Sequence, residues 1–394
     1  MQPDLSIIIP CYNCSKTLKQ AFDSCFRQNL TINYEIVMVD DYSTDNTREI
    51  IKELSVGHNN IVLEFHKQNR GGGATRNTAV KNASAQIIFC LDSDDILQNG
   101  TLEKMYNLIK STKSDGVGIQ TSIKFSENDT KKVSFINEFG YVGKKIPFES
   151  LIEKDNTNMC SLYSTFMFTK KAFEIVGGYP EGHGFDTQSF AWRFLANGLT
   201  AYTCPNAQYF HRINFTKSYY IREYESGKIN HNWYKTLEEF LYLFDRNVQK
   251  EIMYFDLNST TKVLLNSIKK FDKIFKDGYE NLVTNNTSDQ YEKYLSNVKE
   301  ISREDKYWLG TKKFSTGKFS EAFDIFEFLI KDGVNTGYTH YYLQKCSELS
   351  NRESKLIDQK KIDQLFTYAK QGSRLNIFIR IYRKIIRLIK KIYD

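Results

Sequence analysis

Short apolar runs alternate with longer amphipathic segments in the first half of the chain. Four runs are apolar almost throughout, as buried strands are, and lie at residues 5–9, 35–39, 61–65 and 86–91. The segments with a helical period lie at residues 16–28, 44–54, 79–82 and 101–110. Apolar strands that alternate with helices are typical of a parallel sheet that helices cover on both faces. The pattern predicts an α/β fold with a doubly wound sheet.

The pattern changes after residue 205, which is the last of the five prolines. From about residue 226 the sequence is rich in Lys, Glu, Phe, Leu and Tyr, which indicates helices. Residues 305–345 have the spacing of a tetratricopeptide hairpin, and an ordinary helical pair explains that spacing as well. We therefore expect an α/β domain at 1–225, a helical domain at 226–350 and a helical tail at 351–394.

Composition and charge narrow the classes of function. The chain has 394 residues, of which 41% are hydrophobic and 26% charged, so it holds globular domains. The net charge is +7, and residues 374–394 alone carry seven Lys or Arg against one acid. The rest of the chain is therefore nearly neutral, which argues against nucleic acid as a partner. Seven scattered cysteines with a single CxxC, at Cys11 and Cys14, indicate reduced thiols and no zinc site.

The basic tail at 374–394 has its apolar residues at helical intervals and its basic residues between them. Such an amphipathic helix suits an anionic membrane surface. Packing on its own domain or at a dimer interface is the alternative, and a homo-oligomer stays open. The chain begins without the charged and apolar regions of a signal peptide, and no apolar run reaches about eighteen residues. We expect a cytoplasmic protein, peripheral at the inner face of the membrane.

Polar residues follow the predicted strands, where ligands bind in open parallel sheets. They lie at residues 10–13, 40–45 and 92–95, and the glycine-rich segment 69–77 lies between them. The carboxylates of residues 92–95 repel one another unless a cation or hydrogen-bond donors compensate, and Mg²⁺ or Mn²⁺ commonly takes one or two carboxylates with substrate phosphates. For Asp95 alone, a helix N-cap is the alternative. The glycines allow close approach of a ligand, unless they only form a turn.

These segments resemble the inverting glycosyltransferases of family 2, which have the GT-A fold. The matching motifs are SIIIPCYN, VDDYSTDNT, NRGGGATRN and FCLDSDD, the last as the DxD motif of the family. They occur in the correct order within 95 residues, and the resemblance covers residues 4–215. It implies a mixed, mostly parallel GT-A sheet, a nucleotide-sugar donor and a Mn²⁺ or Mg²⁺ ion.

The resemblance also implies which residues bind the donor: Pro10, Tyr12, Asp41, Asn69, Arg76, Asp92 and Ser93. Tyr12 would stack on the base, and Asp41 would accept a hydrogen bond from its ring N–H. Asp92 would face the ribose, and Asp94 would bind the metal, a role that Asp95 can share or take over. Tyr42 stands where the family has Gly, which matters only if that turn requires a positive φ.

The acceptor side departs from the family pattern. Residues 176–198 resemble the segment in which the family has Glu-Asp several residues before an Arg, and here Asp186 takes the place of the Glu and Thr187 that of the Asp. An inverting transfer requires a carboxylate that takes the proton of the acceptor hydroxyl. We expect Asp186 to be this base, with Glu181 in reserve. The alternative is that Asp186 only caps a helix that begins at Thr187.

His211 and Arg212 follow a predicted strand at 207–210. The resemblance implies that a neutral His211 completes the metal shell and that Arg212 binds phosphate. A structural place for this His, in the core or on the surface, is the alternative. The other histidines have no zinc-binding spacing.

The sequence thus predicts a metal-dependent inverting glycosyltransferase, a hexosyl- or N-acetylhexosaminyltransferase. It would transfer a sugar from a nucleotide donor, by family preference a UDP-sugar, to a hydroxyl of a cell-envelope glycan or lipid-linked acceptor. The altered acceptor pair leaves open a nucleotide-binding protein with impaired catalysis, and the helical half leaves open a scaffold of glycan assembly. A nucleotidyltransferase has less support, because the glycine-rich segment has no lysine placed for phosphate activation.

Overall fold

The chain divides into two compact units, residues 1–216 and 217–394. A computed structural model describes residues 2–126, 129–147, 150, 160–163, 165–181, 186–213, 235, 238–243, 246–254 and 288–364. The finer boundaries predicted at residues 225 and 350 stay predictions.

One mixed sheet forms the centre of the N-terminal unit. In its described residues nine strands pair in the order β3-β2-β1-β4-β8-β6-β9-β5, with β7 beside β6. The strands are β1 (Leu5–Cys11), β2 (Tyr34–Asp40), β3 (Ile61–Phe65), β4 (Ile87–Cys90), β5 (Ile96–Leu97), β6 (Gly116–Phe125), β7 (Val133–Glu138), β8 (Phe166–Thr169) and β9 (Ala201–Arg212). β1, β2, β3, β4, β6 and β9 run in one direction and β5, β7 and β8 in the other. The predicted GT-A class, a mixed and mostly parallel sheet, is confirmed.

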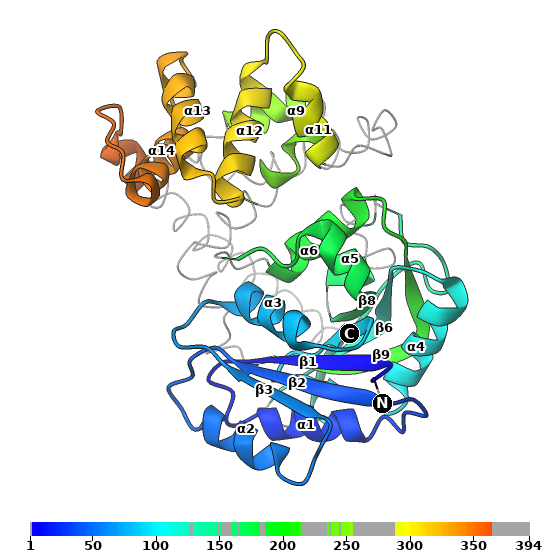
Figure 1. Ribbon diagram of the computed structural model, residues 1–394. Coiled ribbons are helices and arrows are strands. Elements are labelled where there is room, and N and C mark those ends of the chain that lie inside the picture. Colours follow the sequence, from blue (N-terminus) through cyan, green and yellow to red (C-terminus); the bar gives the residue numbers. More distant parts are fainter. Residues whose placement is uncertain are drawn as a thin grey trace, which may run out of the picture. The chain divides into compact units, whose positions relative to one another are not determined.

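Helices lie on both faces of this sheet (Figure 1). They are α1 (Leu18–Phe26), α2 (Thr47–Ser55), α3 (Gly72–Asn82), α4 (Thr101–Thr112), α5 (Lys170–Val176) and α6 (Asp186–Ala196). Apolar residues of α1, α2 and α4 pack with those of β1 and β2 in one buried cluster. On the other face Phe166 and Phe168 of β8 contact Phe190 of α6 with ring centres 5.6 and 5.2 Å apart. These aromatic contacts fix the position of α6, which carries Asp186.

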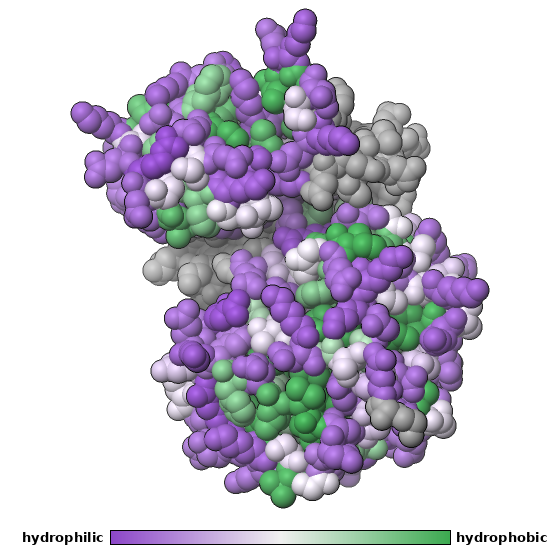
Figure 2. Space-filling view, in the orientation of Figure 1, coloured by the Kyte–Doolittle hydropathy of each residue, from purple (hydrophilic) through white to green (hydrophobic). Residues whose placement is uncertain are grey.

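Strand β1 lies in the middle of the parallel part and leads to the predicted site. It pairs with β2 along its whole length, whereas its pairing with β4 ends at Ile8 and Cys90. Pro10 lacks an N–H, and it lies beyond the end of the β4 pairing, so no hydrogen bond to β4 is lost there. Strand β3, which pairs with β2, forms one edge of the sheet, and all of its residues are half-buried. Figure 2 shows a hydrophobic area near this edge, surrounded by polar residues.

In its described residues the C-terminal unit is helical. Its helices are α9 (Arg246–Met253), α11 (Ser288–Leu295), α12 (Arg303–Ser315), α13 (Phe319–Lys331) and α14 (Gly337–Ser350). Phe326 of α13 stacks on Tyr342 of α14 at 4.8 Å and meets Tyr307 of α12 edge-on at 6.0 Å. The predicted helical region is therefore confirmed, and its tetratricopeptide type stays a prediction.

The basic tail at 374–394 lies outside the described residues. Among the helices that the structure describes, none combines the length and the apolar character needed to cross a bilayer.

Candidate active site

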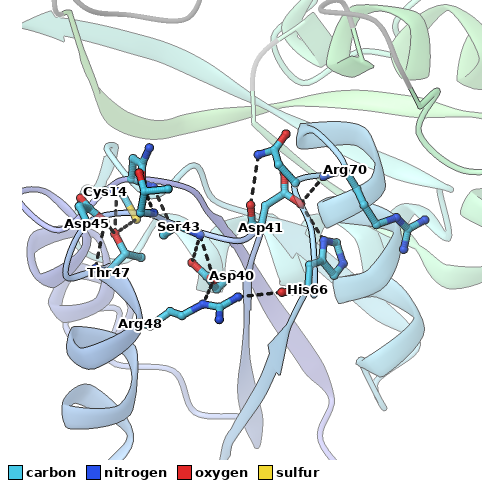
Figure 3. Close-up of polar contacts among 12 residues, drawn as sticks. Cys14, Asp40, Asp41, Ser43, Asp45, Thr47, Arg48, His66 and Arg70 are labelled. Carbon is cyan, nitrogen blue, oxygen red and sulfur yellow. Dashed lines mark hydrogen bonds and ion pairs between the residues drawn. The ribbon is translucent and has the colours of Figure 1, made fainter.

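The turn after β2 is tied to the glycine-rich segment through Asp41. Its Oδ1 accepts a hydrogen bond from the backbone N–H of Arg70 at 2.8 Å and lies 2.7 Å from His66 Nδ1, and its Oδ2 accepts from the N–H of Gly71 at 2.8 Å (Figure 3). Asn69 donates to the backbone carbonyl of Asp41 at 3.1 Å. Two predicted donor-binding residues, Asp41 and Asn69, are therefore adjacent. The carboxylate of Asp41 fixes the loop that begins α3.

The turn after β1 is joined to the turn after β2. The N–H of Asn13 donates to Ser43 Oγ at 2.9 Å, and Asn13 Oδ1 accepts from the N–H of Thr44 at 2.8 Å. Tyr12 and Tyr42 lie on these two turns and are 46% and 47% exposed. The two turns thus present two aromatic side chains to solvent, of which only Tyr12 was predicted to bind the donor.

The turn after β2 does require a left-handed backbone, because Tyr42 has a φ of 62°. The departure from the family's Gly therefore has a structural consequence. The guanidinium of Arg48 lies 5.4 Å from the centre of the Tyr42 ring. Arg48 is itself held by Asp40 Oδ2 at 2.5 Å and by the carbonyl of His66 at 2.7 Å (Figure 3).

The glycines at the start of α3 allow two parts of the chain to approach each other. A Cβ atom at Gly73 would lie 2.0 Å from the carbonyl oxygen of Pro180, and one at Gly72 would lie 2.9 Å from Asp186 Oδ2. At these two positions the space next to the glycine is filled by the acceptor-side segment. Gly72 and Gly73 therefore bring α3 against that segment. The predicted close approach of a ligand stays a prediction.

Arg76 of α3 joins the predicted donor side of the site to the predicted acceptor side. Its Nη2 donates to Asp92 Oδ1 at 2.6 Å, and its Nη1 donates to Asp186 Oδ2 at 2.5 Å. Arg76 is 9% exposed, and although burial opposes it, the charges of Asp186 and Asp92 raise its pKa well above the usual range. The neighbouring Asn77 holds the backbone of Tyr179 through hydrogen bonds of 2.8 and 2.9 Å. One turn of α3 thus positions both carboxylates.

The two candidate bases differ in their surroundings. Asp186 is the first residue of α6, and its Oδ1 accepts from the N–H of Thr187 at 2.9 Å while its Oδ2 binds Arg76. It is therefore more than a helix cap. Glu181 accepts from Arg70 at 3.2 Å and from Asn77 at 3.0 Å, with 47% of its side chain exposed. Arg76 links Asp186 to Asp92 in the turn at residues 92–95, the DxD turn. Glu181 has no such link and contacts Asn77 of α3 and Arg70 before it.

The DxD turn, residues 92–95, follows β4 and is closed by a backbone hydrogen bond between its first and last residues. The backbone carbonyl of Asp92 accepts from the N–H of Asp95 at 3.0 Å, and the buried Asp95 accepts from the N–H of Arg212 at 3.0 Å. The two residues after Asp95 form β5, so the alternative that Asp95 caps a helix is wrong. Asp94, which lies between Asp92 and Asp95 in the turn, is exposed. Ser93 lies on the same turn and is half-buried.

His211 and Arg212 are the last two residues of β9, and the predicted strand at 207–210 was too short. β9 extends because it pairs with β6 up to Phe125 and Arg212. His211 Nδ1 lies 3.6 Å from Asp95 Oδ2, and Arg212 donates to the carbonyl of Asp94 at 2.8 Å. The guanidinium of Arg212 therefore stabilises the DxD turn by its hydrogen bond to the backbone carbonyl of Asp94.

Burial and the charged groups around the DxD turn shift the pKa values of several side chains there. The pKa of Asp94 is raised by desolvation from the protein groups around its carboxylate, and then by repulsion from Asp95 and Asp92. Burial and the charge of Asp92 raise the pKa of Asp95 as well. Burial, followed by the charge of Lys124, lowers the pKa of His211 below 6.5, so the imidazole is neutral at pH 7. Lys124, the strand partner of His211, has its own pKa lowered by burial.

The residues at this turn fit a divalent cation that a substrate would help to hold. In the part of the chain that the structure describes, no group of three or more His, Cys, Asp or Glu is arranged as a metal cage. Mg²⁺ and Mn²⁺ need no such cage where phosphate oxygens complete the shell. Asp94 offers an exposed carboxylate and His211 a neutral imidazole, and a cation would relieve the repulsion among the crowded carboxylates.

Sequence reasoning missed three residues of this region. His66, which bonds Asp41 and Thr78, directly follows β3, so the rule that found the other polar strand ends applies to it too. Lys124 lies near the end of β6, and only the pairing of β6 with β9 brings it to the DxD turn. Gln20 of α1 accepts from Arg212 at 2.6 Å, and no local pattern indicates this contact.

Residues 6–175 match the family described as Glycosyl transferase family 2. The N-terminal unit therefore contains a family 2 glycosyltransferase domain. Similar curated proteins are a poly(ribitol-phosphate) beta-glucosyltransferase of Bacillus spizizenii, 37% identical over 28% of this chain and 18% of its own length, and the glycosyltransferase GlyG of Streptococcus pneumoniae, 25% identical over 48% and 64%. TarP of Staphylococcus aureus, a poly(ribitol-phosphate) beta-N-acetylglucosaminyltransferase, is 34% identical over 28% of this chain and 34% of its own length.

The chain thus spans less than two thirds of the length of these three relatives. Among solved structures, residues 1–349 of TarS from S. aureus in complex with UDP-GlcNAc are similar, with 17% identity and a TM-score of 0.49 over 95% of this chain and 92% of that one.

Proposed function

We propose that this chain is a metal-dependent inverting glycosyltransferase, which transfers a hexosyl or N-acetylhexosaminyl group from a nucleotide-sugar donor to a hydroxyl. The observation that carries the proposal is the bridge formed by Arg76. It connects Asp92, at the DxD turn of the donor side, with Asp186, on the acceptor side, at 2.6 and 2.5 Å. A group transfer needs a donor-binding and an acceptor-activating carboxylate near each other, and this arrangement supplies both.

Asp186 is the proposed general base. The acceptor oxygen attacks the anomeric carbon while Asp186 takes its proton, and the bond from that carbon to the nucleoside diphosphate breaks on the opposite face. The ion pair with Arg76 fixes the direction in which the carboxylate of Asp186 points. Thr187, which stands where the family has an Asp, has no carboxylate for this role.

The donor lies at the ends of β1, β2 and β4 in this proposal. Tyr12 stacks on the base, Asp41 accepts from it, and Asp92 faces the ribose. Asp94 and His211 would hold the Mn²⁺ or Mg²⁺ ion. When bound, such an ion neutralises the negative charge that develops on the leaving diphosphate. Arg212, whose side chain holds the DxD turn, keeps Asp94 in position for it.

The donor and acceptor classes rest on the relatives. Proteins named as glucosyl- and N-acetylglucosaminyltransferases of poly(ribitol-phosphate) are among them, which supports a UDP-sugar as donor and a cell-envelope polymer or its lipid-linked precursor as acceptor. Such an acceptor is met at the inner face of the membrane. The basic tail at 374–394 is the proposed contact with that surface.

Two substitutions test the proposal. Asp94→Ala removes the metal ligand, and Asp186→Asn removes the base while it keeps the size of the side chain. We expect each to lower the rate of sugar transfer from a UDP-sugar about a hundredfold or more. Glu181→Gln is the matched control and keeps the wild-type rate. Full transfer by both site variants would refute the mechanism.

A protein that binds the nucleotide but has lost catalysis is the second candidate, and Thr187 is the observation that favours it. It predicts tight UDP binding by the wild-type chain without turnover of any donor. It also predicts that Asp186→Asn leaves UDP affinity unchanged, so only the transfer assay separates the two candidates.

A further inference from the structure

Tyr42 has a backbone conformation that its side chain disfavours. In the described residues, the non-glycine positions with positive φ are mostly Asn, which tolerates this conformation, and the others are Tyr42, Lys113 and Tyr141. Lys113 lies at the C-terminal cap of α4, where helices commonly end with a left-handed residue. A bulky residue at φ 62° within a turn is a strained position, and such positions are enriched at ligand-binding sites.

The ring of Tyr42 is supported on one side. The guanidinium of Arg48 lies 5.4 Å from the ring centre. Arg48 is fixed by hydrogen bonds to Asp40 at 2.5 Å and to the carbonyl of His66 at 2.7 Å, so this support does not depend on a mobile side chain. The residue nevertheless stays 47% exposed. Arg48 thus holds the ring of Tyr42 in place while part of the ring stays exposed to solvent, where a ligand can contact it.

The position of Tyr42 in the chain indicates which class of ligand it could contact. It directly follows Asp41, the predicted partner of the donor's base, and its turn is hydrogen-bonded to the turn of Tyr12 through Asn13. Tyr12 and Tyr42 are exposed to the same extent. A flat heteroaromatic ring is the ligand that two exposed aromatic side chains on joined turns match best, because every nucleobase has a face on which a ring can stack.

We propose that Tyr42 contacts the base of the donor nucleotide and contributes to its selection, and that the strained turn is kept for this contact. The inference rests on the proposed function, since it requires a nucleotide donor. It adds a specificity residue at a position where the family usually has Gly, so it concerns a property of this chain.

Four variants of the full-length protein test it, with UDP as the probe. Tyr42→Gly removes ring and strain together, Tyr42→Asn removes the ring but tolerates the left-handed backbone, and Tyr42→Phe keeps the ring. Tyr141→Gly is the matched control, because Tyr141 has a similar φ of 59° and belongs to the loop after β7 and not to the turns after β1 and β2. UDP affinity is measured calorimetrically with Mn²⁺, and the unfolding temperature without nucleotide.

We expect Tyr42→Gly and Tyr42→Asn to weaken UDP binding about tenfold, which is the size of one base-stacking contact. Their unfolding temperature should not fall, because relief of the backbone strain offsets the lost contact with Arg48. Tyr42→Phe and Tyr141→Gly should bind UDP as the wild type does.

Wild-type affinity in Tyr42→Gly and Tyr42→Asn would overturn the inference and leave the proposed function standing. Absence of UDP binding by the wild type, with binding of no other nucleotide, would overturn both. A tenfold loss in Tyr141→Gly as well would also contradict the inference, because it would assign the effect to the backbone.

Discussion

Arg76 is the residue on which the geometry of the proposed site depends most. Its guanidinium contacts two carboxylates whose positions in the sequence are 16 and 110 residues away. Its Nε is buried and has no hydrogen-bond partner in the described part of the chain, so the charge of the group is balanced at its Nη atoms alone. The side chains of its partners Asp92 and Asp186 are 41% and 14% exposed.

We predict that Arg76→Met destabilises the N-terminal unit by about 3 kcal/mol, because it leaves two carboxylates close together without their shared cation. Sugar transfer should fall with it. The matched control is Arg70→Met, whose ion pair with Glu181 is exposed on both sides and should contribute less than about 1 kcal/mol. Urea unfolding measures both variants. Equal stability of the two would contradict the role given to Arg76.

Individual site residues could be predicted where the signal is local. Asp41, Asp92 and Asp94 follow apolar strands, and the strand-end rule places them at one edge of the sheet. The partner of Arg76 could not be predicted in this way, because Asp186 lies on a helix far away in the sequence. The sequence showed that Tyr42 replaces a Gly, but it did not show whether the turn requires a positive φ. That depends on how the turn is hydrogen-bonded to the turn after β1.

At the scale of elements, helix α3 is the connection between the proposed donor and acceptor sides. It begins at glycines that lie against Pro180 and Asp186, and it carries Arg76 and Asn77. Strands β1 to β4 agree closely with the runs that the sequence predicted. The antiparallel β8 between β4 and β6 was not predicted, because strand order depends on contacts between distant segments.

We predict that Gly73→Ala shifts α3 away from the acceptor segment. The added Cβ would meet the backbone of Pro180 at 2.0 Å, and backbone cannot move aside as a side chain can. The variant should lose about 1–3 kcal/mol of stability and at least tenfold in transfer rate. Gly317→Ala is the control, since its Cβ meets nothing within 4 Å and only its φ of 78° is strained. A normal rate in Gly73→Ala would show that α3 does not set the geometry.

In the C-terminal unit, Asp305 at the start of α12 joins three helices. It accepts from Arg246 of α9 at 2.7 Å, from Tyr291 of α11 at 2.7 Å and from Ser302 at 2.8 Å. Although burial opposes it, these hydrogen bonds lower the pKa of Asp305 below its ordinary value of 3.8. The folded unit therefore favours the ionised carboxylate.

The pH dependence of stability follows from this shift. The stabilisation is fully present above the unfolded-state pKa and is lost as the pH falls through the lowered, folded-state pKa. We predict that Asp305→Asn destabilises the protein at pH 7 and that the difference from the wild type shrinks toward pH 2. Helix unfolding followed by circular dichroism measures it. A difference that stays constant over this range would exclude the linkage.

At the scale of the whole molecule, every residue proposed to act in transfer lies in the N-terminal unit. The net charge, in contrast, lies almost entirely in the tail at 374–394. We predict that the full-length protein sediments with vesicles containing anionic lipid, and less so as salt is raised. Replacement of Arg383, Lys384, Arg387, Lys390 and Lys391 by Gln should abolish the binding. Equal binding to neutral vesicles would contradict an electrostatic contact.

The most direct test of a nucleotide and metal site at the strand ends is thermal unfolding of the full-length protein with UDP, dTDP, GDP and CMP, each with and without Mn²⁺. A ligand that binds only the folded state raises the unfolding temperature by mass action. We predict a rise with UDP that requires Mn²⁺ and is lost in Asp94→Ala. No rise with any of the four nucleotides would contradict the account.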